Sequence, residues 1–247
     1  TVHSELSKLG PDFFSVTYGA GGSTKSGTQQ IVLRYQAAGS TCAPHLSFGG
    51  SDEEELRQLL QTYIDAGIDR LVALRGDMPS GVGAAVQHRY ANERVEFIRR
   101  ETNDHFHIDV ACYPEIHPES KSYACDIDFF KRKVDAGADS AITQYFYNPD
   151  AYFRFVDSCR AADIDIPIVP GIMPITNYAN LARFSSSCGA EIPRWLDKRL
   201  VGFGDDTESL RSFGIDVVTE LCEDLLQGGA PGLHFYSMNL SQAVTQV

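Results

Sequence analysis

The 247-residue sequence lacks the patterns that mark a disulfide-rich, zinc-binding or membrane protein. Its six cysteines are scattered, with no C-x-x-C pair and no His/Cys cluster, which argues against a disulfide framework and against a zinc site. We therefore expect no metal, and reduced thiols in the cytoplasm are the simpler interpretation. No apolar stretch approaches the length of a membrane span, and no signal peptide is visible. These absences predict a cytoplasmic protein with no membrane partner.

Basic residues are also scarce. The chain has 21 Lys and Arg residues against 33 Asp and Glu residues, and its formal net charge is −12. A chain this acidic has no broad basic face, so nucleic acid is not an expected partner. The excess of acidic residues still allows a local basic pocket for a phosphate group.

Four common site motifs are missing as well. The glycine-rich loop at residues 19–23 is not followed by the Gly-Lys-Ser/Thr of a P-loop. No G-x-G-x-x-G follows the first expected strand, which argues against the dinucleotide fold. There is no G-x-S-x-G elbow, and no Cys and His are placed as a nucleophile and its base would be. Both absences argue against acyl transfer.

What the sequence does contain is a regular alternation of strand and helix patterns. An amphipathic helix is expected over residues 1–10, ending at Gly10. Strands are expected over residues 13–18, 41–48, 71–75, 108–113, 140–147, 166–169 and 233–237. Further helices are expected over residues 28–38, 51–66, 91–100, 126–136, 151–162, 177–187, 193–200 and 207–227.

This alternation predicts an α/β fold with a parallel sheet and helices outside it. Seven strands are counted, whereas a (β/α)8 TIM barrel needs eight to close. We therefore expect a single (β/α)8 barrel domain over residues 1–247, with its first strand missing from this chain and lying upstream of Thr1. An open doubly wound sheet is the less favoured alternative.

The strand at residues 71–75 shows how these strands end. Its apolar run suits a parallel strand that is covered on both faces. It stops at Arg75, Gly76 and Asp77, and Pro79 cannot continue a ladder. An Arg–Asp pair that closes a loop would explain this tripeptide equally well when it is taken alone.

Polar and aromatic residues follow the other strands in the same way, and the active site of a barrel lies at these carboxyl ends. The residues concerned are Thr17, Tyr18, His45, Arg75, Asp77, Tyr113, Glu115, His117, Thr143, Gln144 and Tyr236. Such a ring predicts a polar mouth with flat walls for a large planar ligand. The histidines are more readily explained as hydrogen-bonding groups than as metal ligands.

Two basic residues, Arg132 and Lys133, lie late in an expected helix near this mouth. They could bind a phosphate group. Basic residues at this position also complement the helix dipole, and the residues alone do not decide between the two interpretations.

Seven segments together resemble the methylenetetrahydrofolate reductase family. They occur in the family's order and span nearly all of the chain: SVTYGA (15–20), APHL (43–46), VALRGD (72–77), YPEIHPE (113–119), KRKVDAGA (131–138), AITQ (141–144) and HFY (234–236). The resemblance implies a (β/α)8 flavoprotein oxidoreductase of one-carbon metabolism and methionine biosynthesis. It also implies the cofactor FAD and, as in bacterial members, a homo-oligomer.

The implied reaction is a ping-pong hydride transfer through the flavin. NADH or NADPH reduces FAD and leaves, and 5,10-methylenetetrahydrofolate then binds in the same place and is reduced to 5-methyltetrahydrofolate. The resemblance does not separate NADH from NADPH.

The resemblance also implies roles for individual residues. Those matching cofactor-binding positions are Thr17, His45, Arg75, Gly76, Asp77, Tyr90, Ala91, Ala111, Tyr113, His117, Asp126, Arg132 and Lys133. Those matching substrate-binding positions are Gln144, Asn180, Phe184 and Tyr236. Asp77 is the implied catalytic residue, beside the flavin and the pterin, and the two basic residues of the helix would neutralise the pyrophosphate.

The chain departs from the family pattern at three points. The family's proton-donating Glu lies on the first strand, in a segment that this sequence does not contain. The Asn-Arg after the last strand is here Asn239-Leu240, and Phe129 stands where some relatives are polar. These departures leave open a flavin-binding homologue or partner subunit that no longer reduces folate. A weaker alternative is an unrelated barrel lyase or aldolase without flavin.

Overall fold

The computed structural model describes residues 1–18, 25–47, 53–75 and 90–247. It divides the chain into two compact units. The first unit comprises Thr1–Gly10, Cys112–Lys131 and Ala141–Val247, and the second comprises Pro11–Ala111 and Arg132–Ser140. The expectation of a single domain stays a prediction.

Eight strands occur among the described residues. They are β1 (Phe14–Val16), β2 (Cys42–Leu46), β3 (Arg70–Ala73), β4 (His107–Cys112), β5 (Ser140–Thr143), β6 (Ile168–Val169), β7 (Gly171–Ile172) and β8 (His234–Phe235). The first six form one sheet in the order β1-β2-β3-β4-β5-β6, and β7 pairs with β8. The register is parallel, with Phe14 opposite Cys42, Arg70 opposite His107, Ala141 opposite Ile168 and Gly171 opposite His234.

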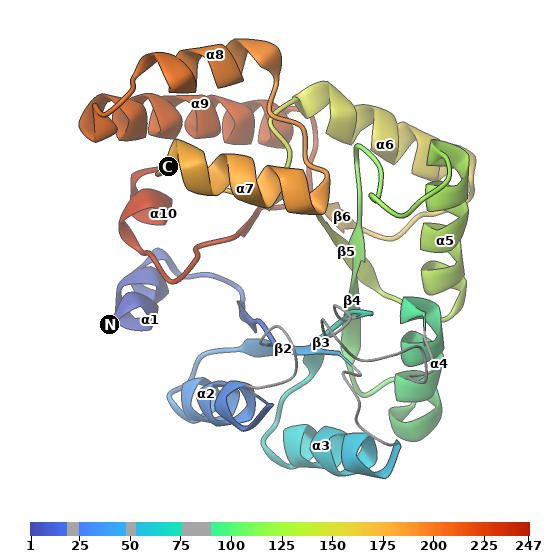
Figure 1. Cartoon of the computed structure of the whole chain (residues 1–247). Helices are drawn as coiled ribbons and strands as arrows, with labels where there is room; N and C mark the ends of the chain where they lie inside the picture. Colours follow the sequence, from blue (N-terminus) through green and yellow to red (C-terminus); the bar gives the residue numbers. More distant parts are fainter. Residues whose placement is uncertain (19–24, 48–52, 76–89) are drawn as a thin grey trace, which may run out of the picture. The chain divides into compact units, whose positions relative to one another are not determined.

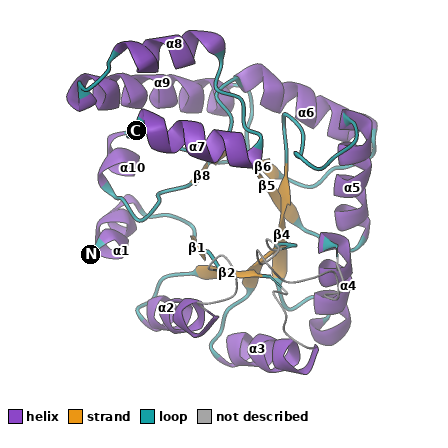
Figure 2. Ribbon diagram, viewed as in Figure 1, coloured by secondary structure: helices purple, strands orange, loops and turns teal. Residues whose placement is uncertain are grey.

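Helices alternate with these strands along the chain (Figures 1 and 2). They are α1 (Val2–Leu6), α2 (Lys25–Ala37), α3 (Glu53–Asp65), α4 (Ala91–Thr102), α5 (Tyr123–Asp135), α6 (Pro149–Ala161), α7 (Tyr178–Cys188), α8 (Arg194–Gly202), α9 (Thr207–Gln227) and α10 (Gln242–Gln246), with a short 3₁₀ helix at Ser7–Leu9. Local signals explain several ends. Asn148 caps α6 ahead of Pro149, and Gly189 ends α7 with a left-handed φ of 74°.

These elements confirm the predicted α/β fold, and their sequential parallel order is that of a (β/α)8 barrel that lacks its first strand. Two predicted strands differ from the described ones in their bounds. The predicted strand 140–147 stops at Thr143, because the side chain of Gln144 accepts the Tyr145 N–H at 3.0 Å in place of a ladder partner. The predicted strand 166–169 appears as β6 and is followed after Pro170 by the separate strand β7.

The second unit contains a charged pair that joins β3 and β4. Arg70 Nε and Nη2 donate to the two carboxylate oxygens of Asp109 at 2.7 and 2.9 Å, and Asp109 is completely buried. Ser140 donates its hydroxyl to the same carboxylate, and His107 Nε2 lies 2.8 Å from the Ser140 oxygen. The Arg70 guanidinium also lies 4.0 Å from the centre of the Phe13 ring. This network joins the amino-terminal ends of β3, β4 and β5.

The first unit packs its helices through aromatic and glycine contacts. Figure 2 shows α8 running beside α9, and the rings of Phe203 and Phe213 lie 5.5 Å apart at this contact. Gly228, at the end of α9, lies against the Phe153 ring of α6, where a Cβ atom would have no room. None of the helices in the described ranges is both long and apolar enough to cross a membrane.

Candidate functional site

The predicted site residues fall in both units. The first unit holds Tyr113, His117, Asp126, Gln144, Asn180, Phe184 and Tyr236, and the second holds Thr17, His45, Arg75, Tyr90, Ala91, Ala111, Arg132 and Lys133. Gly76 and the predicted catalytic Asp77 lie outside the described residues.

The loop between β4 and α5 brings together two of the predicted flavin contacts. The rings of Tyr113 and His117 meet edge to face with their centres 4.5 Å apart. His117 Nδ1 accepts the N–H of Glu119 at 3.0 Å, so the neutral imidazole carries its proton on Nε2. This loop therefore offers an aromatic face and an Nε2–H donor.

Asp126, in the first turn of α5, holds this loop in place. Its Oδ2 accepts the N–H of His117 at 2.9 Å, and its Oδ1 accepts the hydroxyl of Ser120 at 2.9 Å. The carboxylate is buried and lies at the N-terminus of the helix, where the dipole favours a negative charge. Asp126 therefore orients the His117 backbone, and its direct contact with a cofactor stays a prediction.

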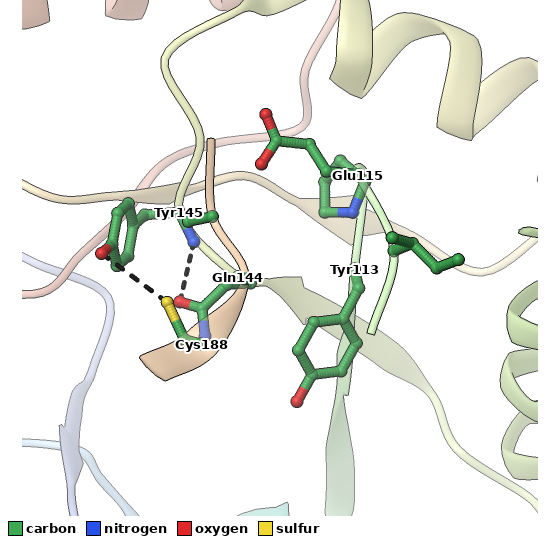
Figure 3. Close-up of a pocket in the computed structure, with 9 residues that line it drawn as sticks. Tyr113, Glu115, Gln144, Tyr145 and Cys188 are labelled. Atoms are coloured by element: carbon green, nitrogen blue, oxygen red, sulfur yellow. Dashed lines mark hydrogen bonds between the residues drawn. The ribbon is translucent and has the colours of Figure 1, made fainter. Parts of the chain in front are cut away.

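A small pocket lies beside this loop in the same unit (Figure 3). It is lined by Tyr113, Pro114, Glu115, Ile116, Gln144, Tyr145, Cys188, Gly189 and Ala190, and its cavity volume of about 10 Å³ is close to that of one water molecule. Three stretches that are distant in the sequence thus meet at one point: the end of β4, the end of β5 and the end of α7.

The polar groups of this pocket restrain one another. Gln144 Oε1 accepts the N–H of Tyr145, which fixes the orientation of the Gln144 amide. The Tyr145 hydroxyl lies 2.9 Å from Ser185 Oγ and 3.6 Å from Cys188 Sγ. Burial raises the pKa of Tyr145 well above its ordinary value, so the phenol stays protonated at neutral pH. No motif predicts these contacts of Ser185 and Cys188, because both residues lie about forty residues further along the chain than Tyr145.

Glu115 was expected only as one of the polar residues at the strand ends. In the structure its half-buried carboxylate accepts the N–H of Glu191 at 2.7 Å. Burial raises the pKa of Glu115, the Glu191 N–H lowers it, and the nearby Glu191 carboxylate raises it further. A hydrogen bond to a backbone N–H so far along the chain has no sequence signature.

Tyr236, which follows β8, points its hydroxyl at the end of β5. It donates to the backbone carbonyl of Thr143 at 2.8 Å, immediately before Gln144. The Thr143 hydroxyl accepts the N–H of Gly171 at 2.9 Å, so β5, β7 and β8 are tied together. Burial raises the pKa of Tyr236 strongly. The hydroxyl therefore supports the backbone beside Gln144, and contact with a substrate stays a prediction.

The two predicted substrate residues on α7 lie one helical turn apart. The N–H of Asn180 is capped by Asn177 Oδ1 at 2.9 Å, and its side chain is exposed. Phe184 is half-buried, and the guanidinium of Arg183 lies 5.2 Å from the centre of its ring. Because positions i and i+4 share a face, α7 presents both side chains on the same side.

In the second unit, two of the predicted cofactor contacts touch each other. Lys133 Nζ donates to the carbonyl oxygen of Ala111 at 2.5 Å. Arg132 is exposed in the last turn of α5, where its charge also complements the helix dipole. The structure thus brings the ammonium of Lys133 to the end of β4.

The other predicted residues of the second unit lie at or just beyond element ends. His45 is on β2 and is half-buried, Arg75 follows β3, and the carbonyl of Thr17 accepts the Thr28 hydroxyl at 3.1 Å beyond β1. Tyr90 precedes Ala91, the first residue of α4, and donates its backbone N–H to Glu93 at 2.9 Å.

The sequential parallel strands, the helices between them and the polar groups after the strand ends define an α/β enzyme of the barrel class. Comparison with known proteins refines this class. The family model for methylenetetrahydrofolate reductase matches residues 2–247. A 5,10-methylenetetrahydrofolate reductase of Buchnera aphidicola is 40% identical over 98% of this chain and 82% of its own length. The enzyme of that name from Escherichia coli is 38% identical over 96% of this chain and 79% of its own length.

The chain belongs to the methylenetetrahydrofolate reductase family and is therefore an oxidoreductase. A solved structure supports the fold independently. It is an uncharacterized protein from Clostridium thermocellum that binds two copies of 5-methyl-5,6,7,8-tetrahydrofolic acid. The two chains align with a TM-score of 0.57 over 100% of this chain and 97% of that one, at 16% identity.

Proposed function

We propose that this chain uses FAD and NAD(P)H to reduce 5,10-methylenetetrahydrofolate to 5-methyltetrahydrofolate. The observation that carries the proposal is the family match over residues 2–247. The polar groups at the ends of β4, β5 and β8 support it, because they lie where barrel enzymes carry their active sites.

The residues of the β4–α5 loop fit a flavin nucleotide. The paired rings of Tyr113 and His117 offer an apolar surface together with an Nε2–H donor, which suits a large ligand with a polar edge. In the second unit, Arg132 and Lys133 would neutralise the charge of the pyrophosphate. Bound FAD would supply the two-electron chemistry of both half-reactions.

On the substrate side, Gln144 and Phe184 would bind the folate. The Gln144 amide, oriented by the Tyr145 N–H, can donate and accept hydrogen bonds at the pterin edge. Phe184 would pack against a planar ring, and Asn180 on the same face of α7 would add a polar contact. Tyr236 would keep Gln144 in place through the carbonyl of Thr143.

Asp77 would be the catalytic residue. A carboxylate beside the pterin can hydrogen-bond to it and favour the positive charge that develops when the imidazolidine ring opens. The position lies outside the described residues, so this role depends on the family match and on the tripeptide Arg75-Gly76-Asp77.

One observation favours a second candidate, a flavin-binding homologue or partner subunit that no longer reduces folate. Leu240, which stands where the family has an arginine, is 52% exposed, and it offers no cation to a substrate carboxylate. This candidate predicts oxidation of NAD(P)H without turnover of methylenetetrahydrofolate.

A steady-state comparison of two acceptors tests the proposal. The purified protein should oxidise NADH or NADPH with menadione and, in a separate assay, with methylenetetrahydrofolate. Turnover with both acceptors supports the reductase, and turnover with menadione alone supports the second candidate. A protein that purifies without flavin and turns over with neither acceptor contradicts both. The same assays decide between NADH and NADPH. A homo-oligomeric state and a cytoplasmic location stay predictions.

A further inference from the structure

The backbone at Ile116 is strained. Its φ of 155° lies in a region that favours glycine, and isoleucine is branched at Cβ. Such a conformation ordinarily costs about 1 to 3 kcal/mol and persists only where surrounding contacts hold it. The contacts on either side of Ile116 would therefore supply this restraint.

Both neighbours of Ile116 are held by a carboxylate hydrogen bond. On one side, Glu115 Oε2 accepts the N–H of Glu191 at 2.7 Å. On the other, the N–H of His117 donates to the carboxylate of Asp126 at 2.9 Å. The two bonds span different distances along the sequence. The Asp126 bond joins the loop to α5, the helix that follows it, whereas the Glu115 bond joins the loop to the segment that follows α7.

That segment also touches the loop through Gly189, the residue that ends α7. A Cβ atom at Gly189 would lie 2.8 Å from Pro118 Cγ and 3.8 Å from the Ile116 carbonyl oxygen, so Gly189 lies directly against the loop. Gly189 and Ala190 line the same pocket as Glu115 and Ile116. The Glu115–Glu191 bond therefore closes a contact between two segments that are already packed together.

Each of these segments carries predicted ligand contacts. The loop carries Tyr113 and His117, and α7 carries Asn180 and Phe184. Figure 3 shows the Glu115 carboxylate directed away from the Tyr113 ring and from Gln144. Its geometry therefore suits a role in joining the two segments and not a role in touching a ligand in that pocket.

We propose that Glu115 is a positioning residue of the reductase, whose carboxylate holds the Glu191 N–H and so fixes α7 against the β4–α5 loop. This inference rests on the proposed function, because it assumes that folate binds against α7. The Glu115–Glu191 hydrogen bond would keep Phe184 at the correct distance from the flavin-binding side of the loop.

Three variants test the role. Glu115→Ala removes the acceptor, Glu115→Gln keeps an oxygen that can accept the same N–H, and Glu191→Ala changes the partner's side chain while keeping its N–H. Glu191→Ala is the matched control, since only the backbone of residue 191 takes part in the bond.

Two measurements do not need turnover. Amide hydrogen exchange of a peptide spanning residues 189–193 reports the bond directly, and equilibrium binding of 5-methyltetrahydrofolate reports the substrate side. We expect Glu115→Ala to speed exchange in this peptide and to raise the Kd about ten-fold, the loss of one hydrogen bond to a charged acceptor. Glu115→Gln and Glu191→Ala should stay within about three-fold of wild type for binding.

A third measurement distinguishes positioning from general damage. The rate of NADH oxidation with menadione should change less than about two-fold in Glu115→Ala, while KM for methylenetetrahydrofolate rises. Faster exchange with unchanged folate binding would mean a merely structural contact and would overturn the proposal. So would a Glu115→Gln variant as impaired as Glu115→Ala, because that result would assign the function to the charge or the proton.

Failure of the proposed function would appear differently. Wild-type protein that never turns over folate would contradict the reductase, and the binding and exchange measurements would still decide the role of Glu115. If Glu115→Ala does not fold, the double variant Glu115→Ala, Ile116→Gly is used. Glycine adopts the φ of residue 116 without strain, so the Glu115–Glu191 bond is no longer needed to hold it, and folding should be restored. In that background, folate binding as tight as in Ile116→Gly alone would overturn the proposal.

Discussion

At the scale of single residues, the site depends on carboxylates and hydroxyls that hold the backbone. Asp126 accepts the N–H of the predicted contact His117, Tyr236 donates to the C=O beside Gln144, and Glu115 accepts the N–H of Glu191 in the segment after α7. The positions of Glu115 and Tyr236 could be predicted from the sequence, because polar residues after parallel strands gather at one end, whereas Asp126 was implied by the family resemblance alone. Their partners could not be, since a backbone N–H or C=O carries no residue-specific signal.

The raised pKa of Glu115 predicts a pH-dependent stability. Between its ordinary pKa of 4.5 and the higher value that burial produces, the folded state binds more protons than the unfolded state. The free energy of unfolding therefore falls as pH rises through this window. Glu115→Gln avoids the desolvated charge and should be more stable than wild type at pH 7, with the difference shrinking as pH falls toward 4.5.

Urea unfolding of both proteins at a series of pH values measures this difference. Glu191→Gln, which removes a neighbouring negative charge, should shift the same window downward. A difference that does not depend on pH would contradict the assignment of the raised pKa to Glu115.

Tyr236→Phe should lower the free energy of unfolding by about 1 to 2 kcal/mol, because it leaves the buried Thr143 carbonyl without its hydroxyl partner. Thermal unfolding measures the change. The comparison variant is Tyr178→Phe, whose partner Asp197 lies nearer the surface and can be hydrated, so its cost should be smaller. Equal costs would mean that the Tyr236 hydroxyl is not a buried support of β5.

At the scale of elements, the alternation of strands and helices was predictable and the ends were not. Every predicted strand overlaps a described one, because buried parallel strands are continuous apolar runs. The early end of β5 depends on a side-chain contact of Gln144, which no periodicity reveals. Residues 19–24, 48–52 and 76–89 lie outside the described part of the chain, and they include the predicted site residues Gly76 and Asp77.

Asp109→Ala should be among the most damaging changes in the second unit. It would leave Arg70 without its bidentate partner between β3 and β4, and breaking a buried pair ordinarily costs about 3 to 5 kcal/mol. Chemical denaturation gives the value. Asp165→Ala is the control, because its contact with Arg160 is 4.0 Å long and Asp165 is exposed, so it should cost less than about 0.5 kcal/mol. Similar costs for the two variants would contradict a structural role for the Arg70–Asp109 pair.

At the scale of the whole molecule, family membership explains several features of the sequence together. The acidic balance, the free thiols and the seven-strand count bound the class of protein, and the family match over residues 2–247 supplies the reaction. The sequence indicates this family because its motifs are short, continuous segments that occur in a fixed order along the chain. Contacts between distant segments, such as the one between Glu115 and Glu191, required the structure.

Asp77→Asn tests the catalytic assignment. We expect the variant to keep its flavin and its rate of reduction by NADH, and to reduce folate more slowly by about one to three orders of magnitude, the range for losing one positioned group. Stopped-flow spectroscopy measures the two half-reactions separately. Equal slowing of both would contradict a role for Asp77 in folate reduction.

We propose that one flavin-bearing site passes reducing equivalents from a nicotinamide to a folate. An anaerobic titration followed by visible absorption tests it most directly. We expect a flavin absorbance at about 450 nm that disappears when NADH or NADPH is added and returns when methylenetetrahydrofolate follows. Loss of the absorbance with nicotinamide and no return with folate would contradict the reductase, and a protein without that absorbance would contradict the flavin itself.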